Sequence, residues 1–164
     1  MHFSSYEFLL VFLPIAWLLY AFTIRRSKSA AIGVLLLLSL FFYAWWSTQY
    51  LLLLIGSIAF NFTIGNALSR YRDRQSRARG FWLGMGVCVN LLLLAYFKYA
   101  DFFVSNLTTV LGWNYEKLEI ILPMGISFYT FTQIAFLVDA YRREAHEYKP
   151  INYGLFVTYF PHLI

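Results

Sequence analysis

Five long apolar segments constrain this chain more than any other feature of its sequence. They cover residues 6–24, 30–47, 50–68, 81–99 and 120–141, and a partial apolar segment covers 151–164. A helix needs about 20 predominantly apolar residues to cross the hydrocarbon core of a bilayer. The chain is 60% hydrophobic and 13% charged, whereas a soluble domain has about 25% charged residues. We therefore predict an all-α, polytopic transmembrane protein, with residues 1–164 forming a single transmembrane domain.

Basic residues define the expected topology. Three connections, 25–28, 70–79 and 142–149, hold 11 of the 13 Lys and Arg residues, and five spans would place all three on the same side. Because Lys and Arg resist translocation, that side is expected to be the cytoplasm and the N-terminus is expected outside. The first segment lacks the basic start and small-residue cleavage site of a signal peptide, so we expect it to be retained.

Several kinds of site are disfavoured by the same sequence. The single cysteine, Cys88, is expected to be a buried inert thiol, and the three histidines are too scattered to suggest a metal site. The clustered arginines of 70–79 could bind nucleic acid, but a short loop between two spans has little room for a groove. We interpret it as a topology anchor that touches anionic lipid headgroups, and we expect no nucleic-acid partner.

The fifth segment, within "LPMGISFYTFTQIAFLVDAYRRE", is unusually polar for a membrane span. Its candidate tunnel or structural residues are Pro123, Gly125, Ser127, Tyr129, Thr130 and Gln133. Pro123 is expected at the helix start, where a missing N–H is tolerated. Ser127, Thr130 and Gln133 recur every three residues and share one helix face. That face could hydrogen-bond to other helices, as we also expect of Asn61, Thr63, Asn66 and Asn90, or it could line a polar tunnel.

Two further sites involve charged or ionisable residues. Asp139 precedes Arg142 and Arg143 by three and four residues, a favourable order for ion pairing on a helix. In "YFPHLI", His162 follows Pro161 inside an apolar segment. An ionisable residue in a membrane segment is a candidate functional residue. His162 could act as a general base, or it could cap a helix broken at Pro161.

Taken together, "LPMGISFYTFTQIAFLVDAYRRE" and the later "FVTYFPHLI" resemble the membrane-bound O-acyltransferase family. The blocks "MHFSSYEFLLVFLPI", "FYAWW" and "LAYFKYADFF" are also similar to its bacterial alginate O-acetylation branch, in the same order. The resemblance spans the whole chain. It implies the N-terminal part of a longer helical enzyme, and this part alone is expected to be inactive.

The resemblance also implies a function. An acyl group, expected to be acetyl, would pass from a cytoplasmic donor such as acetyl-CoA or an acyl carrier, across the bacterial cytoplasmic membrane, to an extracellular polysaccharide. A periplasmic or extracellular acyltransferase partner is implied as well. His162 matches a motif of the branch, while the hallmark catalytic histidine is expected beyond Ile164. A transporter or channel subunit and a non-catalytic membrane scaffold remain alternatives. No internal repeat is visible to support a transporter.

Overall fold

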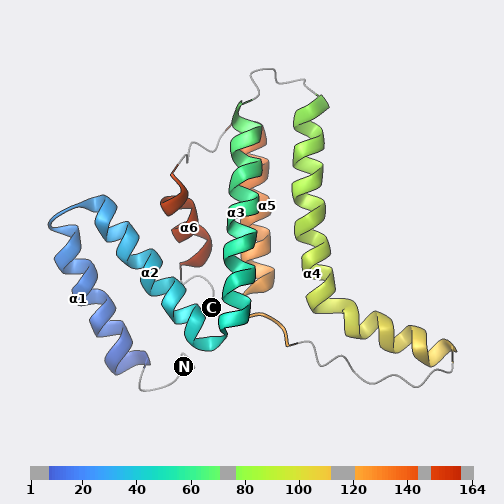
Figure 1. Cartoon of the computed structure of the whole chain (residues 1–164), viewed down its shortest axis with the longest axis horizontal. Helices are drawn as coiled ribbons and strands as arrows, with labels where there is room; N and C mark the ends of the chain where they lie inside the picture. The colour runs from blue at the N-terminus through green and yellow to red at the C-terminus, as the bar shows by residue number, and fades with distance from the viewer. Residues whose placement is uncertain (1–7, 71–76, 112–120, 144–148, 160–164) are drawn as a thin grey trace. The chain divides into compact units, whose positions relative to one another are not determined.

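A computed structural model describes residues 8–70, 77–111, 121–143 and 149–159. Every regular element in these ranges is helical (Figure 1). In chain order, they are η1 (Phe8–Phe12, a π-helix), α1 (Leu13–Ile24), α2 (Lys28–Trp46), α3 (Thr48–Arg70), α4 (Arg77–Leu111), α5 (Ile126–Arg142) and α6 (Pro150–Thr158). The all-α prediction is therefore confirmed for the described residues.

Three of the described helices are long and apolar enough to cross a membrane. They are Lys28–Trp46, Thr48–Ser69 and Arg77–Leu107, and Leu10–Ile24 forms a shorter apolar helix. The chain is thus a multi-pass membrane protein. The fifth predicted span is shorter than expected, because α5 has 17 residues, or roughly 26 Å at 1.5 Å per residue. The five-span topology stays a prediction.

The described helices fall into two compact units. One comprises η1, α1, α2, α3 as far as Thr63, and α6, while the other comprises α3 from Ile64, α4 and α5. In the first unit, α2 packs against both α1 and α6. The Phe62 and Tyr153 rings stack there with their centroids 5.6 Å apart, and Gly154 lies against Leu36. The prediction of one transmembrane domain stays a prediction.

Local chemistry explains where several helices begin and end. Pro14 lies in the first turn of α1, directly after the π-helix η1. Because proline has no N–H, it cannot donate to a carbonyl of the preceding turn, and the change from π-helix to α-helix falls next to it. A single extended residue, Ser47, separates α2 from α3, so the uncharged connection predicted there is even tighter than its sequence suggests.

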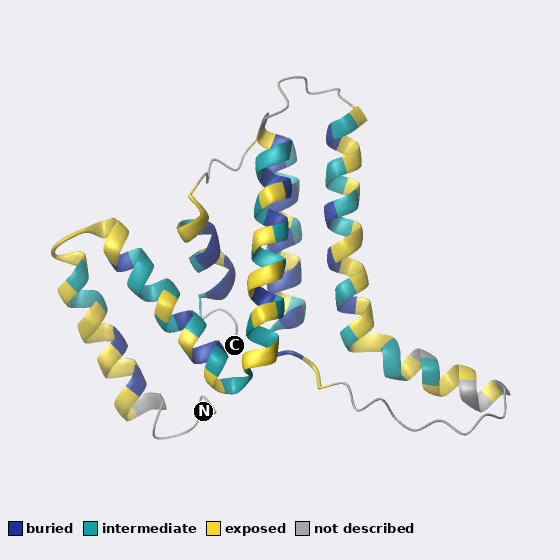
Figure 2. Cartoon of the chain, viewed as in Figure 1, coloured by how far each residue is buried: buried dark blue, intermediate teal, exposed yellow. Residues whose placement is uncertain are grey.

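The helix α4 extends beyond the predicted span, and one sequence expectation about it is wrong. The span is predicted to end at residue 99, and the helix continues to Leu111, with no proline or glycine between Gly86 and Leu111. Cys88 is exposed rather than buried. Figure 2 shows exposed residues along much of α4, and an apolar exposed surface suits contact with lipid tails.

Candidate functional site

The polar stretch identified from the sequence begins with a turn instead of a helix. Pro123 is expected at the helix start, but α5 begins three residues later, at Ile126. Gly125 adopts a left-handed conformation with φ of 70°, which glycine tolerates without steric cost. The Ile126 N–H donates to the Pro123 carbonyl at 3.2 Å, and the Tyr129 N–H donates to the Gly125 carbonyl at 2.9 Å. Pro123 and Gly125 therefore set the entry into α5.

The predicted polar face of α5 lies largely inside the protein. Tyr129, Thr130 and Gln133 are each 0% exposed, whereas Ser127 is only partly buried. The Thr130 hydroxyl has no hydrogen-bond partner among the described residues. A buried hydroxyl left unpaired costs about 1–3 kcal/mol. The buried face thus carries a hydroxyl group, that of Thr130, to which no described residue bonds.

Close packing brings α5 against α3 and α4. Gly65 of α3 faces the ring of Phe136, and Gly86 of α4 faces Leu137. A methyl group added at Gly65 would lie 2.8 Å from the Phe136 Cζ atom. Both glycines therefore allow the backbones of α3 and α4 to approach side chains of α5. Small residues at helix contacts are typical of membrane proteins, where van der Waals packing drives helix association.

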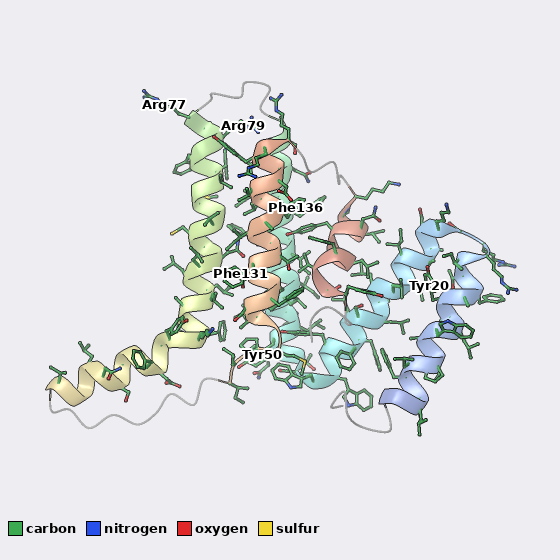
Figure 3. The ribbon with its side chains drawn as sticks, turned by 180° about the vertical axis from the view of Figure 1, so that it is seen from behind. Tyr20, Tyr50, Arg77, Arg79, Phe131 and Phe136 are labelled. Atoms are coloured by element: carbon green, nitrogen blue, oxygen red, sulfur yellow. The ribbon has the colours of Figure 1, made fainter. Side chains whose placement is uncertain are left out.

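One arginine links α4 to the C-terminal end of α5. Arg79 Nη2 donates to the Tyr141 carbonyl oxygen at 2.6 Å, and the guanidinium carbon lies 5.1 Å from the centroid of the Tyr141 ring. Figure 3 shows Arg79 near the end of α5. Arg79 is 1% exposed. Because the last carbonyl groups of a helix carry partial negative charge, this buried cation stabilises the end of α5.

Arg79 is a residue whose role the sequence analysis missed. It was assigned to the basic loop 70–79, but it lies in the first turn of α4 and is buried. Its position immediately before the apolar run "GFWLGMGV" was the available signal. An arginine at that boundary can either reach water or cap a neighbouring helix, and the sequence alone does not distinguish these roles.

The charged C-terminal end of α5 is closed by backbone hydrogen bonds. Arg143 follows the helix in a left-handed conformation with φ of 64°, and its backbone N–H donates to the Ala140 and Asp139 carbonyls. The predicted side-chain ion pair of Asp139 with Arg142 or Arg143 stays a prediction. Pro161 and His162 lie outside the described residues, so their predicted roles are also untested.

The other intramembrane polar residues bond within their own helices. Asn61 Nδ2 donates to the Ser57 carbonyl at 2.9 Å, and Asn90 Nδ2 donates to the Gly86 carbonyl at 2.7 Å. Thr63 Oγ1 donates to the Phe60 carbonyl at 2.7 Å. Such bonds satisfy part of each side chain's hydrogen-bonding capacity without a second helix. The predicted hydrogen bonding of these residues to other helices stays a prediction.

Comparisons with known proteins cover the whole chain. It is 36% identical over 189 residues to a peptidoglycan O-acetyltransferase of Helicobacter pylori, an alignment covering 99% of this chain and 36% of that protein. It is 41% identical to a probable alginate O-acetylase, AlgI, of Pseudomonas aeruginosa, covering 100% of this chain and 32% of that protein. The AlgI of Pseudomonas syringae is 39% identical with the same coverage.

This chain therefore spans about a third of the length of the curated relatives it matches. No family model matches it, and no solved structure does. The relatives nevertheless include both alginate O-acetylases and a peptidoglycan O-acetyltransferase, and each aligns with nearly every residue of this chain. These matches confirm the resemblance to the alginate O-acetylation branch that the ordered sequence blocks indicate.

Proposed function

We propose that this chain is part of a membrane O-acyltransferase that moves an acetyl group across the membrane for O-acylation of an extracellular polysaccharide. The observation that carries the proposal is the similarity, over 99–100% of the chain, to proteins named as O-acetyltransferases or O-acetylases. The acceptors in their names, alginate and peptidoglycan, both contain carbohydrate chains with free hydroxyl groups. A polymer hydroxyl is accordingly the proposed acceptor.

The proposal includes a direction of transfer. The donor would be acetyl-CoA or an acyl carrier on the cytoplasmic side, and the acceptor side would be extracytoplasmic, with a second acyltransferase as a partner there. The N-terminus would lie outside the bacterial cytoplasmic membrane. This orientation is supported by the basic connections, which would all fall on one side, and that side would be the cytoplasm.

Within this function, α5 would form part of the wall of the acyl-transfer tunnel. Support comes from the buried polar face, above all from Thr130, which has no hydrogen-bond partner in the described residues. A histidine held in a dry tunnel would take the proton of the acceptor hydroxyl as its oxygen attacks the thioester carbonyl of the donor, and would return that proton to the donor sulfur as the C–S bond breaks. Correct positioning of the two groups would supply much of the rate enhancement. His162 is one candidate, and a hallmark histidine beyond Ile164 is the preferred one.

The test measures O-acetyl groups on the polysaccharide of cells that lack the gene and are complemented with variants. Deletion should remove the O-acetyl signals from proton NMR spectra of the purified polymer, and the complete gene should restore them. Retention of normal acetylation after deletion would overturn the proposed function.

His162→Ala and His146→Ala form a matched pair in the same assay. Loss of acetylation with only His162→Ala would assign that residue an essential role, and retention in His162→Gln would then indicate a structural role. Normal acetylation in all three variants would leave the catalytic histidine beyond Ile164, as we propose. Antibody access to an N-terminal tag in intact spheroplasts would test the orientation, and a tag protected from the antibody would contradict it.

A further inference from the structure

The length of α4 exceeds what a bilayer can contain. The helix has 35 residues, which corresponds to about 52 Å at 1.5 Å per residue. The hydrocarbon core is about 30 Å thick and takes about 20 residues. If the core begins just after the buried cation Arg79, it ends near Tyr99. The residues 99–111, here termed the α4 arm, must then lie mostly outside the hydrocarbon or run along its surface.

The side chains at that point match a membrane–water boundary. Tyr96 is 59% exposed and Tyr99 is 43% exposed, and the Lys98 ammonium lies 5.6 Å from the centroid of the Tyr99 ring. Tyrosine prefers the headgroup level, and lysine extends its charge toward water along an apolar stem. Figure 1 shows that α4 changes direction toward its C-terminal end. These boundary residues therefore belong to a helix that does not run straight to its end.

The α4 arm has one apolar and one polar face. At about 100° per residue, Tyr99, Leu107 and Val110 fall within roughly 80° of the helix circumference. Leu107 is 62% exposed and Val110 is 84% exposed. Asp101 and Ser105 project from the opposite side at the same helical spacing. An exposed apolar face opposite a polar face is the pattern of a helix that lies in a membrane interface.

Asn106, a polar residue at the edge of the apolar face, has a hydrogen-bond acceptor within its own helix. Asn106 lies between Phe102 and Val110 on the helix circumference, and its Nδ2 donates to the Phe102 carbonyl at 2.8 Å. That bond reduces the cost of bringing the amide close to lipid. Phe102 itself is 63% exposed, so it adds apolar area on the flank of the same face.

We propose that the α4 arm lies along the membrane–water interface, with Leu107 and Val110 inserted among lipid acyl chains and with Asp101 and Ser105 facing water. Lipid is the occupant favoured by continuity, because the arm is the direct extension of a membrane-spanning helix and its apolar face starts at the boundary tyrosines. The inference is independent of the proposed enzymatic activity.

The test places nitroxide spin labels on single cysteines in the complete protein. Cys88 and any other native cysteine are first replaced by serine, and the protein is reconstituted in vesicles of phosphatidylethanolamine and phosphatidylglycerol. Collision rates with oxygen, which concentrates in lipid, and with a water-soluble nickel chelate are then measured. Leu107 and Ser105 are a suitable pair because both are exposed, so the label does not disturb core packing. Leu91, which is 46% exposed inside the span, is the lipid reference.

The expected ratio of oxygen to nickel collisions is several-fold higher at Leu107 and Val110 than at Ser105, with Leu91 higher still. A high ratio at Ser105 as well would show that the arm continues through the hydrocarbon. Low collision rates with both reagents at Leu107 would show that protein covers this face. High nickel rates at every position would place the arm in water. Each of these three results would overturn the proposal.

Discussion

The contact between Gly65 and Phe136 gives the sharpest test of how α3 and α5 are held together. In Gly65→Ala, the new methyl group would lie 2.8 Å from Phe136 Cζ, well inside the roughly 3.5–4.0 Å at which carbon atoms attract each other. Phe136 is 9% exposed, so its ring cannot simply swing into free space. A second glycine on α3, Gly56, has no atom within 4 Å of the position a methyl group would take.

The expected change in stability of each variant is the sum of two opposing effects, helix propensity and overpacking. Replacing glycine by alanine inside a helix gains about 1 kcal/mol of stability, and this gain is the same for both variants. Overpacking at a filled contact costs about 1–3 kcal/mol and applies only to Gly65→Ala. We therefore expect Gly56→Ala to raise the stability slightly and Gly65→Ala to be less stable than Gly56→Ala by about 2 kcal/mol, the middle of the overpacking range.

The assay is thermal unfolding of the complete protein in detergent, followed by the loss of the monodisperse peak in size-exclusion chromatography at a fixed heating rate. The double variant Gly65→Ala with Phe136→Leu should recover part of the loss, because leucine is smaller and can rotate away. Equal midpoints for Gly65→Ala and Gly56→Ala would refute the packing argument. A loss that Phe136→Leu does not relieve would place its cause elsewhere.

Three further variants, two of them with a matched control variant, test the end and the buried face of α5 in the same thermal assay. Arg79→Gln should lower stability by about 2 kcal/mol, because a hydrogen bond to a charged group is worth about 1.5–3 kcal/mol, whereas the exposed Arg77→Gln should change it by less than about 0.5 kcal/mol. Arg143→Gly should raise stability by about 1 kcal/mol by removing left-handed strain, and Arg142→Gly in the last helical turn should lower it by a similar amount. Thr130→Val should raise stability by about 1 kcal/mol if the hydroxyl is unpaired, and a fall in polymer acetylation in the same variant would indicate that this hydroxyl serves the reaction.

Much of the helical architecture could be predicted because membrane helices leave a simple sequence signal. The apolar segments 30–47 and 50–68 differ from α2 and α3 by only one or two residues at each end. Helix boundaries were harder to predict, because they depend on the backbone conformation of single residues, which hydropathy does not indicate. The helix α5 begins at Ile126 rather than at Pro123 because Gly125 adopts a left-handed conformation. The helix α4 continues to Leu111, beyond the predicted span, because a segment that follows a span can remain helical.

The sequence could predict which polar residues of the candidate site share a helix face, but it could not predict contacts between residues far apart in the chain. Spacing placed Thr130 and Gln133 on one helix face, and the structure buries both. Spacing could not identify Arg79 as the residue that caps α5, because that role depends on a contact with Tyr141 62 residues away. The same limit applies to Gly65, whose importance is visible only once the Phe136 ring lies against it.

The contacts of α5 help to separate what holds the helix from what it is available to do. In a bilayer, apolar side chains gain little by moving from lipid to protein, so close packing and hydrogen bonds must hold the helices together. Gly65, Gly86 and Arg79 supply these contacts to α5. None of them involves the Thr130 hydroxyl, which stays unpaired among the described residues. Because an unpaired buried hydroxyl lowers stability, its presence is better explained by a partner outside the described residues or by the substrate path. The Thr130→Val variant distinguishes these: a structural partner would make the variant less stable, and a substrate path would lower acetylation without lowering stability.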